Sequence, residues 1–361
     1  MRIFLLPIST RRTLLYCERV ASTPAPGQSQ PYSERIVAKA ATTWAGWEKA
    51  EKGWQKQLTG YGNRLFRRIP YQEWGLKSFP PATKARLAET DARQEQEQGG
   101  AGAGNECLYP GAFMKGRSVT DLLTTLATER QPFHRRGMIT SMIWMPITAP
   151  FALVPVIPNI PFFWFAFRAY SHYRALAGGR FLHHLLRRNL VRPKDSKVLD
   201  GLYAASLLNP TRESAAAPAT PPSEEERAWI VAQVEAEAKG DGEGGRGGGE
   251  GEGQAQSQGQ GQGGKEVLLL RPWSGRAMAD AFGLAEMQVE IERAVEQVET
   301  AMRGEAEATA RGQREGAAGQ GRAAGQGRAA EAEAEAAAGE KPVVEEASGV
   351  KTKAAEPDAK R

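Results

Sequence analysis

The chain has 361 residues, enough for two or three ordinary domains, but its 40 glycines and long biased runs reduce the part that can fold. The formal net charge of +5 conceals an asymmetry, because residues 1–210 carry 29 Lys and Arg against 14 Asp and Glu, and residues 211–361 carry 18 against 28. Cys17 and Cys107 lie far apart and in no CxxC or CxxH arrangement, which argues against a disulfide framework or a zinc site and fits a reducing compartment.

Residues 1–31 are predicted to be an N-terminal targeting segment or arm. The opening MRIFLLPISTRRTLLYCERV holds four Arg, several hydroxyl residues and one acid, Glu18, a composition typical of mitochondrial targeting. The alternative is that Ile3 to Ile8 form a short strand or extended arm packed on the body. A Pro/Ser/Gln linker follows.

Residues 32–82 are predicted to be a long amphipathic helix, capped by Ser33 and ended by Pro70, and a rigid connector. Apolar residues recur at steps of three and four, which indicates a heptad seam for a partner helix. The main seam residues are Trp44, Trp47, Trp54, Leu58, Tyr61 and Leu65.

Three glycines of this helix recur at seven-residue intervals: Gly46, Gly53 and Gly60. Because glycine weakens a helix by about 1 kcal/mol against alanine, their regular spacing suggests close approach of another backbone, from this chain or a second copy. The alternative is a helix packed on the protein's own core, with incidental glycines. Residues 83–106 are predicted to be a linker.

Residues 107–210 are predicted to be a membrane region whose apolar core is residues 137–167. This core has 31 residues without a charge, and about 20 apolar helical residues suffice to cross a bilayer. Five prolines inside it exclude one straight helix. A mainly α membrane protein is therefore expected, with a proline-broken transmembrane helix or a re-entrant helical hairpin that turns near residues 155–161. The alternative is a buried core segment of a soluble domain.

Basic residues surround this core, since residues 131–194 carry nine Lys and Arg and no carboxylate. Basic residues that flank an apolar segment favour contact with anionic lipid head groups, such as those of cardiolipin. Nucleic acid is the less favoured partner, because the sequence contains no recognisable nucleic-acid-binding module. The segment from Arg168 to Arg192 is expected to be a helix loosened at Gly178 and Gly179. The predicted headgroup contacts are Arg135, Arg136, Arg168, Arg174, Arg187 and Arg188.

The C-terminal part alternates biased and periodic segments. Residues 211–265 are predicted to be an acidic Gly/Gln-rich linker with a short helix capped at Ser223 to Glu226, residues 266–303 an amphipathic helix, and residues 304–361 a disordered tail. The sequence contains no recognisable nucleophile–base pair, phosphate loop or metal-ligand spacing. We therefore expect neither an enzyme nor a cofactor.

The chain resembles the fungal mitochondrial potassium–proton exchange-related proteins in three stretches. These are MRIFLLPISTRRTLLYC, WAGWEKAEKGWQKQLTGYGNRLFRRIPYQEWGLKS and PFALVPVIPNIPFFWFAFRAYSHYRAL. RPWSGRAMADAFGLAEMQVEIERAV is similar to that family's C-terminal block. The resemblance implies a mitochondrial inner-membrane protein needed for electroneutral exchange of potassium for protons, and hence for control of matrix volume. It supplies no catalytic residues.

Exchange of a cation for a proton usually needs an ionisable group within the membrane, and residues 137–167 contain none. Thr148 and Asn159 are the candidate side chains for an ion path, with a hairpin turn as the alternative role for Asn159. We therefore expect a component or regulator of the exchange system that assembles with itself or with another subunit. The alternatives are an oligomeric transporter of potassium and protons and a cardiolipin-binding scaffold.

Overall fold

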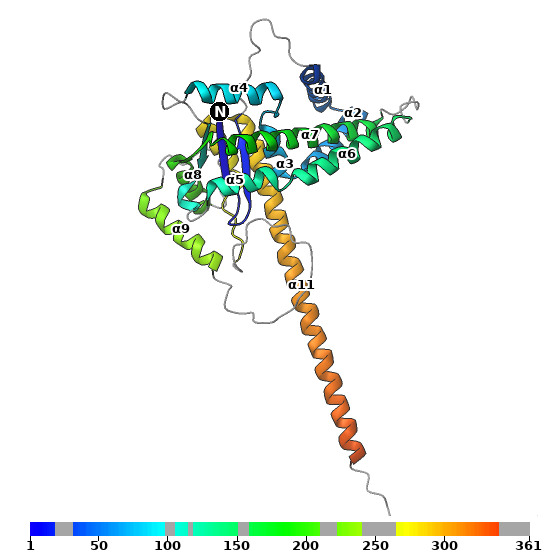
Figure 1. Cartoon of the computed structure of the whole chain (residues 1–361). Coiled ribbons are helices and arrows are strands. Elements are labelled where there is room, and N and C mark those ends of the chain that lie inside the picture. Colours follow the sequence, from blue (N-terminus) through cyan, green and yellow to red (C-terminus); the bar gives the residue numbers. More distant parts are fainter. Residues whose placement is uncertain are drawn as a thin grey trace, which may run out of the picture. The chain divides into compact units, whose positions relative to one another are not determined.

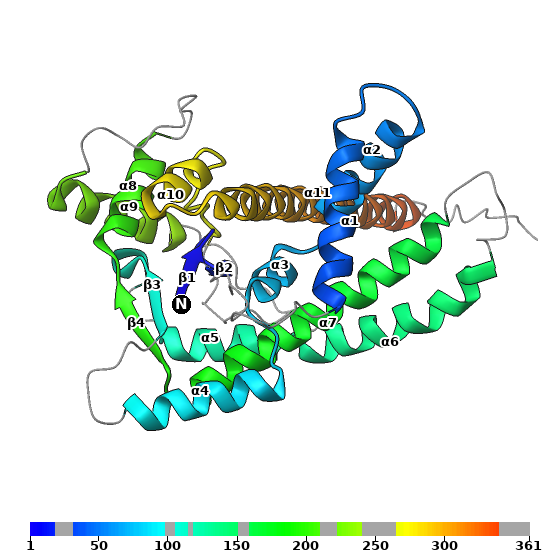
Figure 2. The same cartoon turned by 90° about the horizontal axis from the view of Figure 1, so that it is seen from above.

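The computed structural model describes residues 1–18, 32–97, 105–114, 118–150, 159–209, 222–239 and 265–338 (Figures 1 and 2). Residues 1–302 form one compact unit, and a second unit begins at Arg303. The elements in chain order are β1 (Arg2–Pro7), β2 (Thr13–Cys17), α1 (Tyr32–Glu48), α2 (Trp54–Arg67), α3 (Tyr71–Ser78), α4 (Lys84–Glu97), β3 (Asn105–Tyr109), the short 3₁₀ helix η1 (Gly111–Phe113), α5 (Val119–Thr128), α6 (Gln131–Thr148), α7 (Ile160–Arg187), β4 (Val191–Asp195), α8 (Lys197–Leu208), α9 (Glu224–Lys239), α10 (Ser274–Phe282) and α11 (Ala285–Ala338).

A mixed four-stranded sheet, in the order β2-β1-β3-β4, lies inside the first unit. β1 pairs antiparallel with β2 and parallel with β3, and β3 pairs parallel with β4. Successive strand residues point to opposite faces. Phe4 and Leu6 therefore pack with α8, α10 and α11, and Ile3 and Leu5 with α5 and α7. The apolar run at the N-terminus is thus a strand covered on both faces, which was the alternative interpretation of Ile3 to Ile8.

Helix α3 is packed tightly between β2 and α7 because glycines lie at both contacts. A Cβ atom on Gly75 would be 2.2 Å from the carbonyl oxygen of Leu15, and one on Gly178 would be 2.0 Å from that of Leu76. On Gly179 it would be 2.9 Å from the carbonyl oxygen of Ala127 in α5. The helix was therefore wrongly expected to loosen at Gly178 and Gly179: α7 runs through them, and they admit neighbouring backbones.

The long helix expected from Ser33 to Pro70 is two helices. α1 ends at Glu48 and α2 begins after Gly53, whose φ of 101° is a conformation that glycine adopts without strain. A Cβ on Gly46 or Gly60 would meet nothing within 4 Å, so no backbone from the described part of this chain comes close at these two positions.

Two further segments differ from the expectation. α4 occupies most of the expected linker at residues 83–106, and α11 continues through the expected tail as far as Ala338. Within residues 266–303, Gly283 separates α10 from α11 with a φ of 69°. The cap predicted at Ser223 is confirmed, since its side chain accepts a hydrogen bond from the backbone N–H of Glu226. The cap predicted at Ser33 is not found, because α1 begins at Tyr32 and includes Ser33. The remainder of the expected linker at 211–265 lies mostly outside the described residues.

The expectation of a mainly α membrane protein was wrong. Of the helices that the structure describes, none combines the length and the apolar character that a bilayer crossing needs. The reason is that the uncharged stretch is divided: α6 ends at Thr148, and α7 starts at Ile160 and continues into a buried, arginine-bearing segment. The two helices lie side by side as a hairpin, hereafter the α6–α7 hairpin (Figure 2). The turn was expected near residues 155–161, and residues 155–158 of it lie outside the described part.

Gly178→Ala tests the contact between α3 and α7. We expect a loss of about 1–3 kcal/mol in the free energy of unfolding, because the new methyl group meets a backbone carbonyl that cannot move aside. Gly201→Ala in α8 is the matched control, since its Cβ would meet open space and should add up to about 1 kcal/mol through helix propensity. Urea unfolding measures both. Equal effects at the two positions would contradict the packing described.

Candidate functional site: a buried polar cluster beneath a helical hairpin

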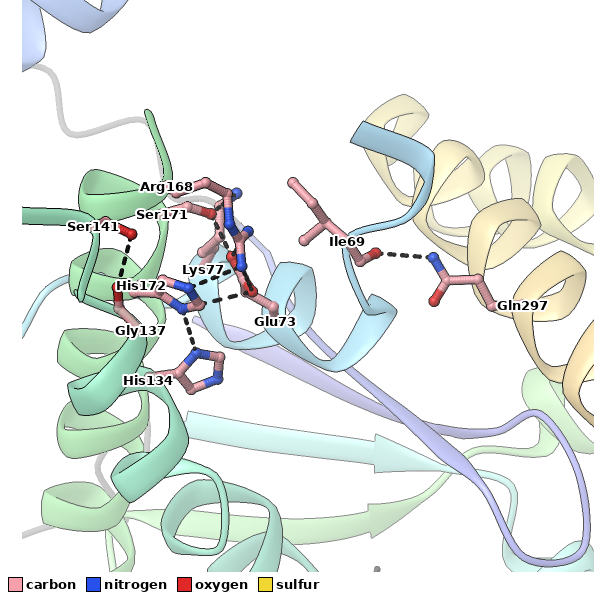
Figure 3. A network of polar contacts seen from close by, with 10 residues as sticks. All are labelled: Ile69, Glu73, Lys77, His134, Gly137, Ser141, Arg168, Ser171, His172 and Gln297. Carbon is pink, nitrogen blue, oxygen red and sulfur yellow. Dashed lines mark hydrogen bonds and ion pairs between the residues drawn. The ribbon is translucent and has the colours of Figure 1, made fainter. Parts of the chain in front are cut away.

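Six side chains from three helices form a buried polar cluster (Figure 3). On α3 its two members are four residues apart, and on α7 two members follow the first by three and four residues, so that each set shares a helix face. Since α3 and α7 pack directly on each other, these faces meet inside the protein. The members of the buried polar cluster are Glu73 and Lys77 of α3, His134 of α6, and Arg168, Ser171 and His172 of α7.

A two-fold ion pair joins α3 to α7 at the centre of this cluster. The Arg168 guanidinium donates from Nη1 to Oε1 of Glu73 at 2.9 Å and from Nη2 to Oε2 at 3.2 Å, and the Glu73 side chain is 1% exposed. Ser171 donates a short hydrogen bond to Oε1 as well. Burial opposes ionisation of Glu73, but the Ser171 hydrogen bond and the Arg168 charge outweigh it and hold the pKa of the carboxyl below its usual value.

The two histidines continue the network from α7 to α6. Nε2 of His172 lies 2.9 Å from Nη2 of Arg168, and Nδ1 of His172 lies 3.1 Å from Nδ1 of His134. Gly137 of α6 leaves room for this ring, because a Cβ there would be 2.5 Å from Nε2 of His172. Burial lowers the pKa of His134 to about 4 and also lowers the pKa of His172, so both rings are neutral at neutral pH.

Lys77 lies at the edge of the cluster, against aromatic rings. Its Nζ donates to Oγ of Ser171 at 2.9 Å and lies 3.3 Å from the centre of the Trp74 ring, and Arg293 of α11 lies over the same ring at 4.5 Å. Burial lowers the pKa of Lys77 to about 7, although the nearby Glu73 carboxylate opposes this shift. Lys77 therefore changes its charge near neutral pH.

Helix α11 fixes the start of α3. The Gln297 side chain donates to the backbone carbonyl oxygens of Arg67 and Ile69 and accepts from the backbone N–H of Tyr71 (Figure 3). These bonds hold the turn between α2 and α3, and with it the position of Glu73.

The arginines expected at lipid head groups separate into two classes. Arg135, Arg136 and Arg187 are exposed. The others bond within the protein: Arg168 to Glu73, Arg174 to the carbonyl oxygen of Lys77, and Arg188 to Asp91.

Thr148 and Asn159, the candidate ion-path residues, lie together where the hairpin helices end. The Asn159 side chain donates to the carbonyl oxygen of Thr148 at 2.8 Å and accepts from the backbone N–H of Phe162, so it caps α7. The Thr148 hydroxyl donates to carbonyl oxygens of its own helix. The alternative role expected for Asn159 was in a hairpin turn, and the bonds that it makes join the end of α6 to the start of α7.

Three of the predicted seam residues pack against one another within the chain. Trp47 packs against Trp44 and Trp54, which closes α1 onto α2, and Phe66 of α2 packs on Trp164 and Phe167 of α7. The other predicted seam residues, Leu58, Tyr61 and Leu65, lie on α2, where Tyr61 and Leu65 are exposed.

The α6–α7 hairpin exposes an apolar surface beyond the cluster. Stacking of Trp144 on Phe165 holds the two helices together there. Seven large side chains remain 41–64% exposed, and we refer to them as the apolar hairpin surface: Ile139, Met142, Ile143, Trp144, Ile147, Ile160 and Phe163.

Of the buried polar cluster, only Arg168 is among the residues singled out from the sequence, and it was expected to play a different role. A signal was present, since Glu73 and Lys77 are four residues apart, as are Arg168 and His172. That spacing places each pair on one helix face. It does not say that the two faces, 95 residues apart for Glu73 and Arg168, come together.

A family model described as mitochondrial K⁺-H⁺ exchange-related matches residues 2–186. The chain belongs to this family. The matched range contains the whole buried polar cluster and the apolar hairpin surface. It also contains the three N-terminal stretches that resemble the family, so the family resemblance is confirmed; the block that starts at Arg271 lies outside the match. Membership relates the chain to mitochondria and to K⁺/H⁺ exchange.

Two fungal relatives are similar to the chain. An uncharacterized protein of Schizosaccharomyces pombe is 26% identical over 206 residues, which cover 55% of this chain and 81% of the relative. An uncharacterized protein of Saccharomyces cerevisiae is 22% identical over 201 residues, which cover 52% of this chain and 62% of the relative. No solved structure matches the chain.

Two ion pairs of this protein have the same N–O distance but differ in burial, so their contributions to stability can be compared. Glu73→Gln removes one partner of the buried pair and should lower the free energy of unfolding by about 3 kcal/mol or more, because the Arg168 charge then lacks its counter-ion. Glu106→Gln is the control, since Glu106 also lies 2.9 Å from its partner, Lys194, but both side chains are about half exposed. That loss should stay under about 1 kcal/mol. Urea unfolding at neutral pH measures both, and similar losses would disprove the structural role of the Glu73–Arg168 pair.

Proposed function

We propose that this protein is a component or regulator of K⁺/H⁺ exchange at the mitochondrial inner membrane, and so contributes to potassium and volume homeostasis of the matrix. Family membership supports the general role. The observation that carries the more specific role is the apolar hairpin surface, which is exposed and lies in a segment without a single carboxylate from residue 131 to 194.

An exposed apolar surface of this kind is typical of a docking site. Its residues cluster toward the far ends of α6 and α7, away from the buried polar cluster that anchors the hairpin to α3. The hairpin is thus held at one end and presents large apolar side chains at the other. This arrangement supports assembly with another subunit of the exchange system or with a second copy.

We propose a non-catalytic role for the chain. Both carboxylate oxygens of Glu73 already accept hydrogen bonds from Arg168, and Ser171 is bonded to Lys77 and to Glu73. The Glu73 carboxylate is thus the counter-ion of Arg168, and its lowered pKa makes it a weak base. This supports a structural or regulatory use of the buried polar cluster.

A second candidate role is that of a cardiolipin-binding scaffold at the membrane surface. Arg135 and Arg136 are exposed on α6, within one turn of Ile139, so that basic and apolar groups adjoin. Anionic head groups favour such a combination. In this role the protein would influence ion exchange indirectly.

Ile143→Glu tests the proposed docking surface. Ile143 is 57% exposed, so we expect the free energy of unfolding to change by less than about 0.5 kcal/mol. Potassium-driven swelling of mitochondria from a strain lacking the chain should be restored by the wild type and several-fold less by this variant, because a carboxylate disrupts an apolar contact. Val198→Glu on α8, 53% exposed, is the matched control and should restore swelling fully. Equal restoration by both variants would refute the proposal.

Flotation with liposomes distinguishes the two roles. If the chain floats with cardiolipin-containing vesicles and Arg135→Gln/Arg136→Gln abolishes this without changing exchange, the scaffold role is favoured. If Ile143→Glu lowers exchange and the wild-type chain floats with neither neutral nor anionic vesicles, assembly with a protein partner is favoured.

A further inference from the structure

The direction of each hydrogen bond around the two buried histidines is fixed by Arg168. A guanidinium only donates, so Nε2 of His172, 2.9 Å from Nη2 of Arg168, must accept. The proton of the neutral His172 ring is therefore on Nδ1, and this N–H donates to Nδ1 of His134 at 3.1 Å. The proton of the neutral His134 ring is then on Nε2.

This chain of bonds leaves no nitrogen available for an additional proton. His172 Nε2 accepts from Arg168, and His134 Nδ1 accepts from His172. Nε2 of His134 is buried and has no partner in the described part of the chain. A proton added to either ring must therefore break the Arg168–His172 contact or the contact between the two rings, which links α6 to α7.

Charged groups on every side act on this pair. Glu73 and Lys77 face it from α3, Arg130 from the turn before α6, and Arg168 from α7. Glu73 favours protonation, but its carboxylate is engaged by Arg168 and Ser171. The cations and the burial oppose protonation, so the closed pair is held in the neutral form.

We propose that the His134–His172 pair is a proton-operated latch, which takes up a proton only when the contact between the two rings opens, so that acidification releases α6 from α7. The latch goes beyond the proposed function and does not depend on it. It makes the attachment of the apolar hairpin surface sensitive to pH.

The sign and the size of the effect follow from proton linkage. Burial lowers the pKa of His134 to about 4 in the closed pair, whereas an open, hydrated ring titrates at about 6.5. Between these values the open form binds more protons, so lowering the pH favours opening. For one ring, a change from pH 7 to pH 5 should favour the open form by about 20-fold.

The same residues are less suited to a metal ion. Glu73, His134 and His172 place one ligand atom each within 4.8 Å of one another. However, a metal on Nδ1 of His172 would displace its proton while Nε2 still accepts from Arg168, which leaves an imidazolate. Two more positive charges would also lie beside Arg168 and Lys77. The geometry therefore fits a proton better than a metal ion.

Nitrogen NMR of the full chain labelled with ¹⁵N-histidine tests the bond directions, since the protein has only four histidines. At pH 7.5 we expect His172 in the Nδ1–H form and His134 in the Nε2–H form, both titrating below pH 6.5. His134→Asn and His172→Asn assign the signals. The opposite tautomers, or titration of either ring above pH 6.5, would overturn the latch. A shift of both rings with one equivalent of zinc, reversed by a chelator, would likewise overturn it in favour of a metal site.

Hydrogen exchange tests the release itself. After correction for intrinsic rates, amides of α6 should lose about 20-fold in protection between pH 7 and pH 5 relative to those of α8. His134→Asn/His172→Asn should abolish this difference, and His183→Asn, on the same helix as His172, should leave it unchanged. The latch is wrong if α6 keeps its protection at pH 5 or if the double variant responds like the wild type. Because the readouts use purified protein, failure of the latch leaves the swelling assay of the proposed function unaffected, and the reverse also holds.

Discussion

The buried ion pair between Glu73 and Arg168 is the interaction on which the arrangement of this protein depends. A carboxylate that is 1% exposed is stable only when a counter-charge and hydrogen-bond donors surround it. Arg168 and Ser171 provide them from α7, so α3 and α7 must lie in one register. That register then places His172 beside His134 and ties α6 into the same cluster. The charge pair thus joins α3 to α7, and the contact between the two histidines adds α6.

Packing around α3 enforces the same register by a different means. Gly75 and Gly178 let backbone carbonyls approach where any side chain would collide, and Gln297 of α11 holds the turn before α3. The sheet is covered on both faces, and α3 lies next to its edge strand β2. The hairpin is consequently attached at its buried, polar end, which leaves its apolar end to form the exposed surface. In this member of the K⁺-H⁺ exchange-related family, titratable groups therefore lie at the attached end of the α6–α7 hairpin, and the apolar hairpin surface lies at its other end.

The uncharged stretch at residues 137–167 shows how one composition supports two structures. It is long enough to cross a bilayer, but its prolines divide it. Each half continues into polar residues that pack on the protein. Local hydropathy cannot distinguish these outcomes, because it does not include the acid at position 73 that neutralises Arg168. Of the six arginines that were expected to contact lipid head groups, Arg168 is the one with a buried carboxylate as its partner.

By itself, the sequence determined the family, the helical character of most segments, and the capping at Ser223, because long motifs and local hydrogen bonds depend on neighbouring residues. It also carried the four-residue spacings of Glu73 with Lys77 and of Arg168 with His172. Only the tertiary structure decided that these faces meet, that the N-terminal apolar run is an inner strand of a sheet, and that the tryptophans of the seam pack against one another within the chain. Such contacts join residues up to 280 positions apart, as between Arg2 and Phe282, and no local pattern specifies them.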